Sequence, residues 1–326
     1  MLNKDLHLVD DLSKAEKAAT RDGFGKGLLE LGEKNKDVVG LCADLKESVR
    51  MNWFAEKYPE RYIAVGVAEQ NLAGVAAGLA FAGKIPFASS FSVFSPGRNW
   101  DQLRVSICYS KANVKLCSSH AGLTVGEDGA THQALEDIAI TRVLPNLVVI
   151  VPSDALETKK ATIAIAKYQG PVYMRFSREK TLVYTTEQTP FEIGKALVLK
   201  EGNDATVIAC GIMVAEVLKA AEVLEKEGIS VEVINNHTIK PIDVETIINS
   251  VKKTKAVVTA EEHQKTGGLR GAVLELLAEY DVMAVSGYVA VEDKFGESGT
   301  SVELLEKYGL TAADIVEEVK KVVKKK

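Results

Sequence analysis

Glu69 stands where an apolar segment, residues 62–67, gives way to a helix of small residues that begins at Glu69 itself. Moving an isolated carboxylate out of water costs several kcal/mol or more, so a ligand, a partner group, a helix N-terminus or a proton has to compensate it. Two interpretations follow from the residues alone. Glu69 contacts a ligand, or it only stabilises the first turn of the helix, where the macrodipole favours acids.

A glycine-rich loop, residues 118–133, holds two of the five histidines of the chain, His120 and His132, and an acid, Asp128. Imidazoles donate, accept or shuttle protons near neutral pH, a carboxylate binds hydroxyls, and glycines let the backbone approach a ligand. The loop therefore predicts a site for a polar substrate, although the same histidines could simply satisfy backbone groups of a surface loop. A zinc site is rejected, because the two histidines lack helical i, i+4 spacing and a nearby cysteine set.

An aromatic pair, Phe91 and Phe94, follows the apolar segment at residues 85–88 and is flanked by serines. Paired rings can hold a flat ligand, whereas aromatic side chains more commonly fill cores. The position at the end of a predicted strand favours a pocket.

Composition limits the function classes that remain. A chain of 326 residues with 46% hydrophobic residues is expected to form about two domains, and a net charge of −5 argues against binding a nucleic-acid backbone. The four scattered cysteines indicate reduced, buried thiols and a cytoplasmic setting. We expect no membrane span and no export signal, and the lysine-rich end, residues 319–326, is interpreted as a solvated helix end.

Apolar segments of strand length alternate with segments of helical period, which predicts an α/β protein with a parallel sheet in its first domain. The predicted strands of that domain are residues 38–42, 62–67, 85–88, 114–117, 147–151 and 172–176. Its predicted helices are residues 14–33, 69–82, 100–109, 133–143 and 154–168. After a polar stretch at residues 181–189, strands at 206–210, 230–234, 256–260 and 286–289 alternate with helices again. We therefore predict two α/β domains, residues 1–189 and 190–326.

Three motifs together resemble the pyrimidine-binding and C-terminal parts of transketolase, a thiamine-diphosphate enzyme. They are the run Gly-Glu-Asp-Gly-Ala-Thr-His-Gln at residues 126–133, the turn Ala-Glu-Gln at 68–70 and Cys-Ala-Asp-Leu at 42–45, all in family order. The resemblance covers essentially the whole chain. It implies a pyrimidine-binding domain with a parallel sheet, followed by a transketolase C-terminal-like domain.

The same resemblance assigns cofactor-binding roles. Glu69 corresponds to the acid that contacts N1′ of the aminopyrimidine of thiamine diphosphate, and it is therefore a predicted catalytic residue. Phe91 and Phe94 correspond to the aromatic pocket around the pyrimidine, and Asp44 corresponds to an acid near the thiazolium. The cofactor supplies the electron sink, and the protein positions it.

Sugar-binding roles follow in the same way. His132, the second predicted catalytic residue, corresponds to a histidine near the C1 and C2 oxygens of the ketose, and Asp128 corresponds to the acid that reads a hydroxyl farther along the sugar. The residues that correspond to a phosphate clamp are Arg21, Ser48, His120 and Arg178. Arginine suits this role because it binds phosphate oxygens bidentately, but the two arginines could also be surface charges, and Ser48 could cap a helix.

The chain departs from the family pattern at two positions. Gly97 stands where many transketolases continue the aromatic pocket with a third ring, and Ala121 replaces an acid beside the clamp histidine. These differences weaken the assignment of the sugar more than that of the cofactor.

The family's Gly-Asp-Gly motif, followed further along by Asn, is missing from the sequence. That motif holds the metal and the diphosphate, and Mg²⁺ is commonly shared between carboxylates and phosphates. We therefore expect no metal ligands on this chain. The resemblance implies the C-terminal subunit of a split transketolase, which acts in the pentose phosphate pathway on sugar phosphates. Activity would require an N-terminal subunit in an α2β2 assembly, with subunit contacts made by the small-residue helix that begins at Glu69.

Three alternatives stay open. A 1-deoxyxylulose-5-phosphate synthase-like subunit shares an Asp-Gly-x-Thr-His segment, whereas the histidine loop argues against a 2-oxoacid dehydrogenase E1 beta-like subunit. A non-catalytic scaffold subunit would not need Glu69. In the second domain, Gly267 and Gly268 precede a predicted helix and give weak evidence for a phosphate site; a structural and dimerisation role is favoured there.

Overall fold

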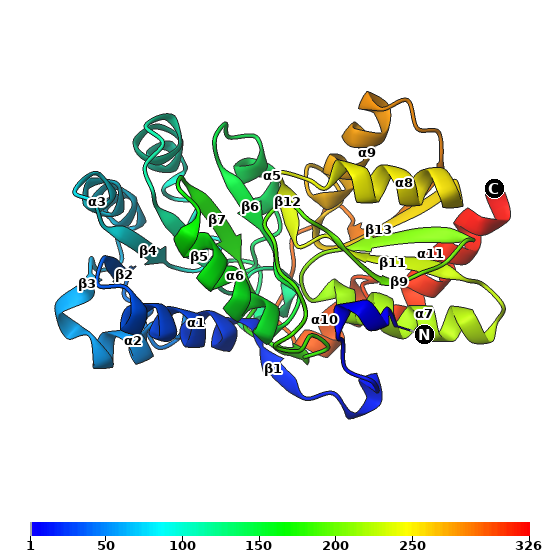
Figure 1. Cartoon of the computed structure of the whole chain (residues 1–326), viewed down its shortest axis with the longest axis horizontal. Coiled ribbons are helices and arrows are strands. Elements are labelled where there is room, and N and C mark those ends of the chain that lie inside the picture. Colours follow the sequence, from blue (N-terminus) through cyan, green and yellow to red (C-terminus); the bar gives the residue numbers. More distant parts are fainter. Residues whose placement is uncertain (1) are drawn as a thin grey trace.

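The computed structural model describes residues 2–326 and shows two sheets, each covered by helices on both faces (Figure 1). The first sheet has seven strands in the order β12-β6-β7-β5-β4-β2-β3, and every pairing in it is parallel except that of β12 with β6. The second sheet has five strands in the order β14-β13-β10-β11-β9, with β9 antiparallel to β11. The predicted α/β class is confirmed.

In the first half the helices follow parallel strands in alternation. Its strands are β1 (Lys17–Ala19), β2 (Val38–Cys42), β3 (Tyr62–Ala64), β4 (Ile85–Ser89), β5 (Lys115–Ser118), β6 (Val148–Ile150), β7 (Val172–Arg175) and β8 (Lys180–Leu182). Its α-helices are α1 (Thr20–Lys34), α2 (Asn52–Lys57), α3 (Glu69–Phe81), α4 (Trp100–Gln102), α5 (Asp137–Arg142) and α6 (Ala155–Lys167).

The second half repeats the alternation. Its strands are β9 (Leu197–Lys200), β10 (Ala205–Ala209), β11 (Val231–Asn235), β12 (Thr238–Lys240), β13 (Ala256–Gln264) and β14 (Val285–Val291). Its helices are α7 (Met213–Lys226), α8 (Val244–Thr254), α9 (Leu269–Glu279), α10 (Ser301–Lys307) and α11 (Ala312–Lys325). Capping boxes at Thr300 and Thr311 fix the starts of the last two helices.

Four predicted boundaries were wrong. The first helix begins at Thr20 rather than at residue 14, because residues 17–19 form an antiparallel pair with residues 180–182. The edge strand β3 stops at Ala64, before Gly66 turns the backbone to φ 74°. The segment predicted as one helix over 100–109 is an α-helical turn followed by a π-helix over Leu103–Tyr109. Helix α5 starts at Asp137 rather than at residue 133, because Ala134 bridges to Ala121.

Buried apolar side chains fill three regions. The first lies between α1, α6 and the first sheet, and Phe24, Leu28 and Phe87 are fully buried there. The second lies on the opposite face under α3 and continues to α8 and α9 of the second half. The third lies under α7 and α11 and includes leucines from residues 2–12. Figure 1 shows this N-terminal segment, in dark blue, beside the second half before the chain crosses to α1.

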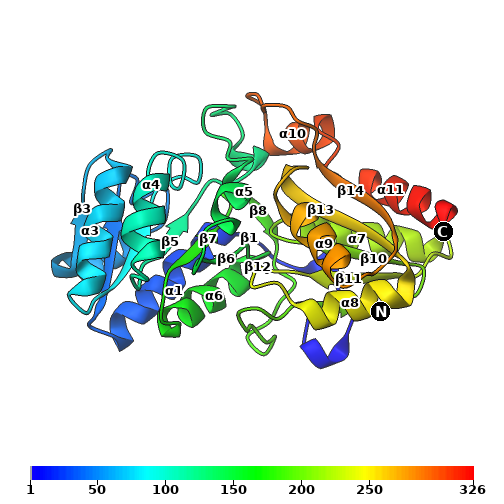
Figure 2. The same cartoon turned by 90° about the horizontal axis from the view of Figure 1, so that it is seen from above.

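The first sheet is completed by the second half. Strand β12 lies beyond β11 in sequence, yet it pairs with β6 at the edge of the first sheet. Figure 2 shows α3 at one end of the molecule and the C-terminal helix α11 at the other. None of the helices among residues 2–326 is both long and apolar enough to span a membrane.

Candidate active site

The predicted site residues gather at the carboxyl edge of the first sheet. Parallel strands end at a common edge, where open α/β sheets bind ligands. Asp44 and Ser48 follow β2, Glu69 follows β3, Phe91 follows β4, and His120 follows β5. Arg178 follows β7, whereas Arg21 comes from the start of α1. The topology therefore brings together loops that are far apart in sequence.

Glu69 is the first residue of α3, and its side chain is only 2% exposed. Ser90 donates a hydrogen bond of 2.9 Å from its hydroxyl to Oε1. Arg98 Nη1 lies 3.3 Å from Oε2, and the arginine side chain is 52% exposed. The helix has no side-chain cap at Ala68, so the carboxylate bonds across to the loop after β4 rather than to its own helix. A purely helix-capping role for Glu69 is therefore excluded.

Four rings form a cluster beside this carboxylate. Phe91 and Phe94 lie nearly parallel, with centroids 6.1 Å apart. His120 stacks on Phe91 at 3.8 Å, and His132 meets the ring of Phe94 edge-on at 5.3 Å. The Arg98 guanidinium lies over the Phe94 ring, 4.1 Å from its centroid. The structure thus brings the predicted aromatic pair and both histidines together.

His120 is buried, and its backbone adopts a left-handed conformation with φ 60°. Ser119 Oγ lies 2.8 Å from its Nδ1. Burial, followed by the charges of Arg21 and Arg178, lowers the pKa of His120 to about 3. This imidazole is therefore neutral at physiological pH and can accept or donate one hydrogen bond without carrying charge.

Cationic side chains surround His120, as the phosphate-clamp prediction requires. Arg21 Nη1 donates a 3.0 Å hydrogen bond to the backbone carbonyl of Ser48, and its buried Nε has no partner. Arg178 donates to the carbonyl of Val125 at 2.5 Å and to Glu127 at 3.1 Å. Burial lowers the pKa of Arg21, and the nearby charge of Arg50 lowers it further. An anion at this position would offset the crowding of positive charge.

Asp44 and Asp128 are exposed at the tips of their loops. Asp44 lies two residues beyond β2 in a left-handed conformation with φ 61°. Ser48 does not cap α2, because the N-cap of that helix is Met51 and has no side-chain cap bond. Thr131 Oγ1 lies 2.8 Å from Nδ1 of His132, which leaves Nε2 of that ring for another partner.

Sequence reasoning missed three residues around the site. Arg98 contacts both Glu69 and Phe94, and Arg50 pairs with Asp22 at 2.6 Å near the clamp. Glu262 comes from β13 of the second half and accepts a 2.6 Å hydrogen bond from the Thr124 amide in the histidine loop. The position of Arg98, four residues after a ring already chosen for the pocket, was a usable signal, whereas nothing local marks Glu262.

The predicted glycine pair before α9 forms no anion site. The carboxylate of Glu261 accepts hydrogen bonds from the amides of Leu269 and Arg270 at 2.7 and 2.8 Å. A Cβ at Gly268 would lie 2.0 Å from Glu261 Oε2, so the glycine makes room for the chain's own acid at the helix N-terminus. The phosphate interpretation was wrong here, because an internal carboxylate holds that position.

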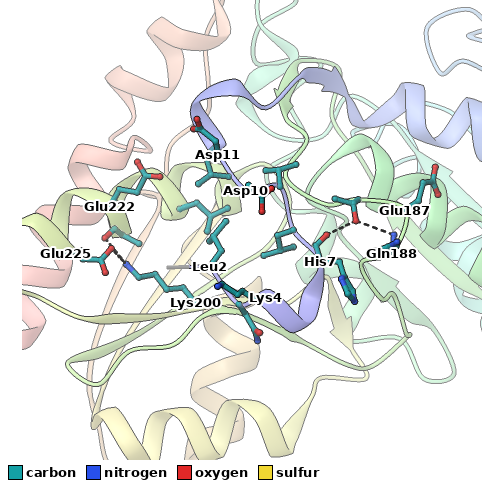
Figure 3. Close-up of a pocket in the computed structure, with 17 residues that line it drawn as sticks. Leu2, Lys4, His7, Asp10, Asp11, Glu187, Gln188, Lys200, Glu222 and Glu225 are labelled. Carbon is teal, nitrogen blue, oxygen red and sulfur yellow. Dashed lines mark hydrogen bonds and ion pairs between the residues drawn. The ribbon is translucent and has the colours of Figure 1, made fainter.

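A separate hollow of about 1020 Å³ lies between residues 2–12, α7 and residues 186–188 (Figure 3). Its rim mixes charges, including the 3.0 Å ion pair of Lys200 with Glu225. Within the described chain, none of the predicted site residues lines it. Across residues 2–326, no cluster of three or more His, Cys, Asp or Glu side chains is arranged to hold a metal ion.

Comparison with known families matches the two halves in turn. Residues 16–182 match the family model of the transketolase pyrimidine-binding domain, and residues 194–315 match that of the transketolase C-terminal domain. The chain belongs to the transketolase family. The resemblance inferred from the three motifs is confirmed.

Full-length relatives cover the same two domains. A transketolase C-terminal section from Methanocaldococcus jannaschii is 48% identical over 94% of this chain and 96% of its own length. A 6-deoxy-6-sulfo-D-fructose transketolase subunit from a Clostridium species is 43% identical over 96% and 97%. One of the two subunits of an apulose-4-phosphate transketolase from Phocaeicola vulgatus is 36% identical over 94% and 98%. This transketolase-family chain therefore corresponds to the C-terminal section of the enzyme.

Solved structures agree. A split-gene transketolase, described as an inactive beta4 tetramer, is 50% identical, covers 94% of this chain and 98% of its own, and superposes with a TM-score of 0.87. A transketolase from Campylobacter jejuni, at 24% identity, shares the fold with a TM-score of 0.81, and this chain spans half of it.

Proposed function

We propose that this chain is the catalytic C-terminal subunit of a thiamine-diphosphate-dependent transketolase that transfers a two-carbon ketol unit from a ketose phosphate to an aldose phosphate. The observation that carries the proposal is the buried Glu69 carboxylate beside the Phe91–Phe94 rings. A carboxylate at the N-terminus of a helix, next to aromatic faces, suits a flat, nitrogen-containing ring that shares a proton with it.

The residues present fit the aminopyrimidine of the cofactor. Glu69 Oε1 is oriented by Ser90, whereas Oε2 is held by a half-exposed arginine that a ring nitrogen could replace. The rings of Phe91 and Phe94 would contact the pyrimidine, and Asp44 would lie towards the thiazolium. Bound thiamine diphosphate supplies the electron sink for carbon–carbon bond cleavage. Glu69 holds a proton at its buried carboxylate, and His132 contacts the reacting oxygens of the sugar.

The clamp supports a substrate with an anionic end. Arg21, Arg178 and the neutral His120 converge, with Arg50 nearby, and an unpartnered guanidinium nitrogen is buried among them. Guanidinium groups bind phosphate oxygens in bidentate fashion. Two relatives are named for 6-deoxy-6-sulfo-D-fructose and for apulose 4-phosphate, both sugars with an anionic group. Asp128 and His132 would read hydroxyls between the anion and the reacting carbon.

A partner subunit completes the site in this proposal. The chain lacks the Gly-Asp-Gly and Asn arrangement that holds magnesium and diphosphate in the family, and two relatives are named as subunits. Helix α3 offers a contact face, because Gly74 and Gly78 meet no other part of the chain and Phe81 is 64% exposed beside them. The assembly would be α2β2, with Mg²⁺ and the diphosphate bound by the N-terminal subunit.

The test is reconstitution with an N-terminal transketolase subunit, thiamine diphosphate and Mg²⁺. We expect ketol transfer from xylulose 5-phosphate to ribose 5-phosphate, and Glu69→Gln should lower it by about two to four orders of magnitude. Its exposed neighbour provides the control, because Gln70→Ala should retain activity, and both variants should bind the partner. Unchanged turnover in Glu69→Gln would refute the catalytic role. Turnover of pyruvate with glyceraldehyde 3-phosphate instead would favour the deoxyxylulose-phosphate synthase alternative.

A further inference from the structure

The histidine-bearing loop, residues 121–133, is held in place by the second half of the chain. Gln133 Nε2 donates to the carbonyls of Leu123 at 3.1 Å and of Glu297 at 3.0 Å, and Ser301 Oγ donates to the carbonyl of Thr124 at 3.2 Å. A Cβ at Gly129 would lie 2.6 Å from Ser298 Oγ, so the loop tip touches the segment before α10. The loop therefore has walls that its own domain does not supply.

Glu262 makes the deepest of these contacts. Its carboxyl group is buried and accepts a 2.6 Å hydrogen bond from the Thr124 amide. A Cβ at Gly122 would lie 2.1 Å from the carboxyl carbon, and Gly122 has φ 82°, so the loop backbone bends directly against this acid. The backbone carbonyl of Glu262 also accepts a 3.1 Å bond from buried Arg175 of β7. The acid thus joins β13 of the second half to the first sheet and to the loop.

The orientation of the acid gives it reach towards the loop. An amide that points at a buried carboxylate loses a charge-assisted hydrogen bond when the carboxylate withdraws, and no water replaces it inside the protein. Thr124 stands between His120 and His132 in the sequence. Any loosening at Thr124 therefore reaches both histidines and Asp128.

We propose that Glu262 is a positioning residue of the second half that fixes the histidine-bearing loop and thereby sets the affinity for the sugar substrate. The consequence for the sugar rests on the proposed function, whereas the fixing of the loop does not. The second half then contributes to substrate binding rather than only to assembly.

Two substitutions separate reach from charge. Glu262→Gln keeps the length and an oxygen that can accept from the Thr124 amide, whereas Glu262→Asp keeps the charge and shortens the side chain by one methylene. Glu232→Asp is the matched control, because Glu232 is another buried acid of the same half and pairs with Lys253 on α8. In the purified chain, amide hydrogen exchange over residues 121–132 should accelerate about tenfold or more in Glu262→Asp and stay near the native rate in the other two variants. Unchanged exchange in Glu262→Asp, or equal acceleration in Glu232→Asp, would overturn the proposal.

The reconstituted complex tests the consequence. Glu262→Asp should raise the KM for the sugar phosphates about tenfold while kcat changes less than about threefold and the Kd for thiamine diphosphate is unchanged, and Glu262→Gln should restore the native KM. A native KM in Glu262→Asp, or a loss confined to kcat, would overturn the role in sugar affinity. If the unsubstituted complex transfers no ketol unit, the proposed function fails, and the exchange experiment still decides whether Glu262 fixes the loop.

Discussion

Acid should destabilise this protein through two buried histidines, His120 and His237. His237 lies just before β12, stacks on Phe191 with centroids 4.3 Å apart, and is fully buried. Burial lowers the pKa of His237 to about 3, as it does for His120, where arginines add to the effect. A base whose pKa is lower in the folded protein takes up its proton more readily when unfolded. Stability is therefore full above the unfolded pKa and falls as the pH drops below it.

The magnitude follows from the two pKa values of each imidazole. With an unfolded pKa of about 6.5, a histidine that stays neutral in the native state removes about 2 kcal/mol of stability between pH 7.5 and pH 5.0. Two such residues remove about 4 kcal/mol, a large part of the stability of an ordinary domain. The loss continues towards the folded pKa near 3.

Urea unfolding at pH 7.5 and pH 5.0, at one protein concentration, measures this loss. His237→Gln should cut the difference between the two pH values by about 2 kcal/mol, whatever its effect at pH 7.5. His7→Gln is the control, because His7 is exposed and its replacement should leave the difference unchanged. An undiminished pH difference in His237→Gln would refute the reasoning, because it would mean that the buried ring takes up a proton in the native state.

Three further predictions concern packing and pairing. Gly23→Ala would place a Cβ 1.8 Å from the carbonyl oxygen of Ala155, so it should lower the free energy of unfolding by about 3 kcal/mol, measured in urea; a native value would contradict the tight α1–α6 contact. Gly78→Ala meets nothing within 4 Å inside a helix, so it should raise stability by about 0.5–1 kcal/mol and weaken assembly with the partner, measured by sedimentation; unaltered assembly would exclude this face from the interface. Arg175→Met removes the buried 3.1 Å partner of Asp137 and should cost about 3–5 kcal/mol in thermal or urea unfolding, and a loss below about 1 kcal/mol would mean that the pair is already solvated.

The α/β class could be predicted because periodicity is a local property. Buried parallel strands appear as continuous apolar runs, and β2, β4, β5 and β7 lie within two residues of their predicted positions. The loops that carry Glu69, Phe91 and His120 could be placed at one sheet edge for the same reason, since chain order and strand direction fix where they emerge.

What failed depends on contacts between distant residues. Residues 14–19 have no local signal against a helix, and only their pairing with residues 180–182 makes three of them a strand. Glu262 looks like an acid in an ordinary strand until Thr124, 138 residues away, points its amide at it. Arg98 was missed because its importance comes from reaching Glu69 across the space between two loops.

The edge strand β12 has a consequence for biosynthesis. A chain emerging from the ribosome exposes β6, with one edge unpaired, well before residues 238–240 are available to cover it. Non-local pairing of this kind delays folding and leaves the growing chain open to association with other strands. The first domain of this protein therefore matures only after much of the second has been translated, so a truncated product that ends near residue 190 would carry an uncovered, sticky sheet edge rather than a finished cofactor-binding module.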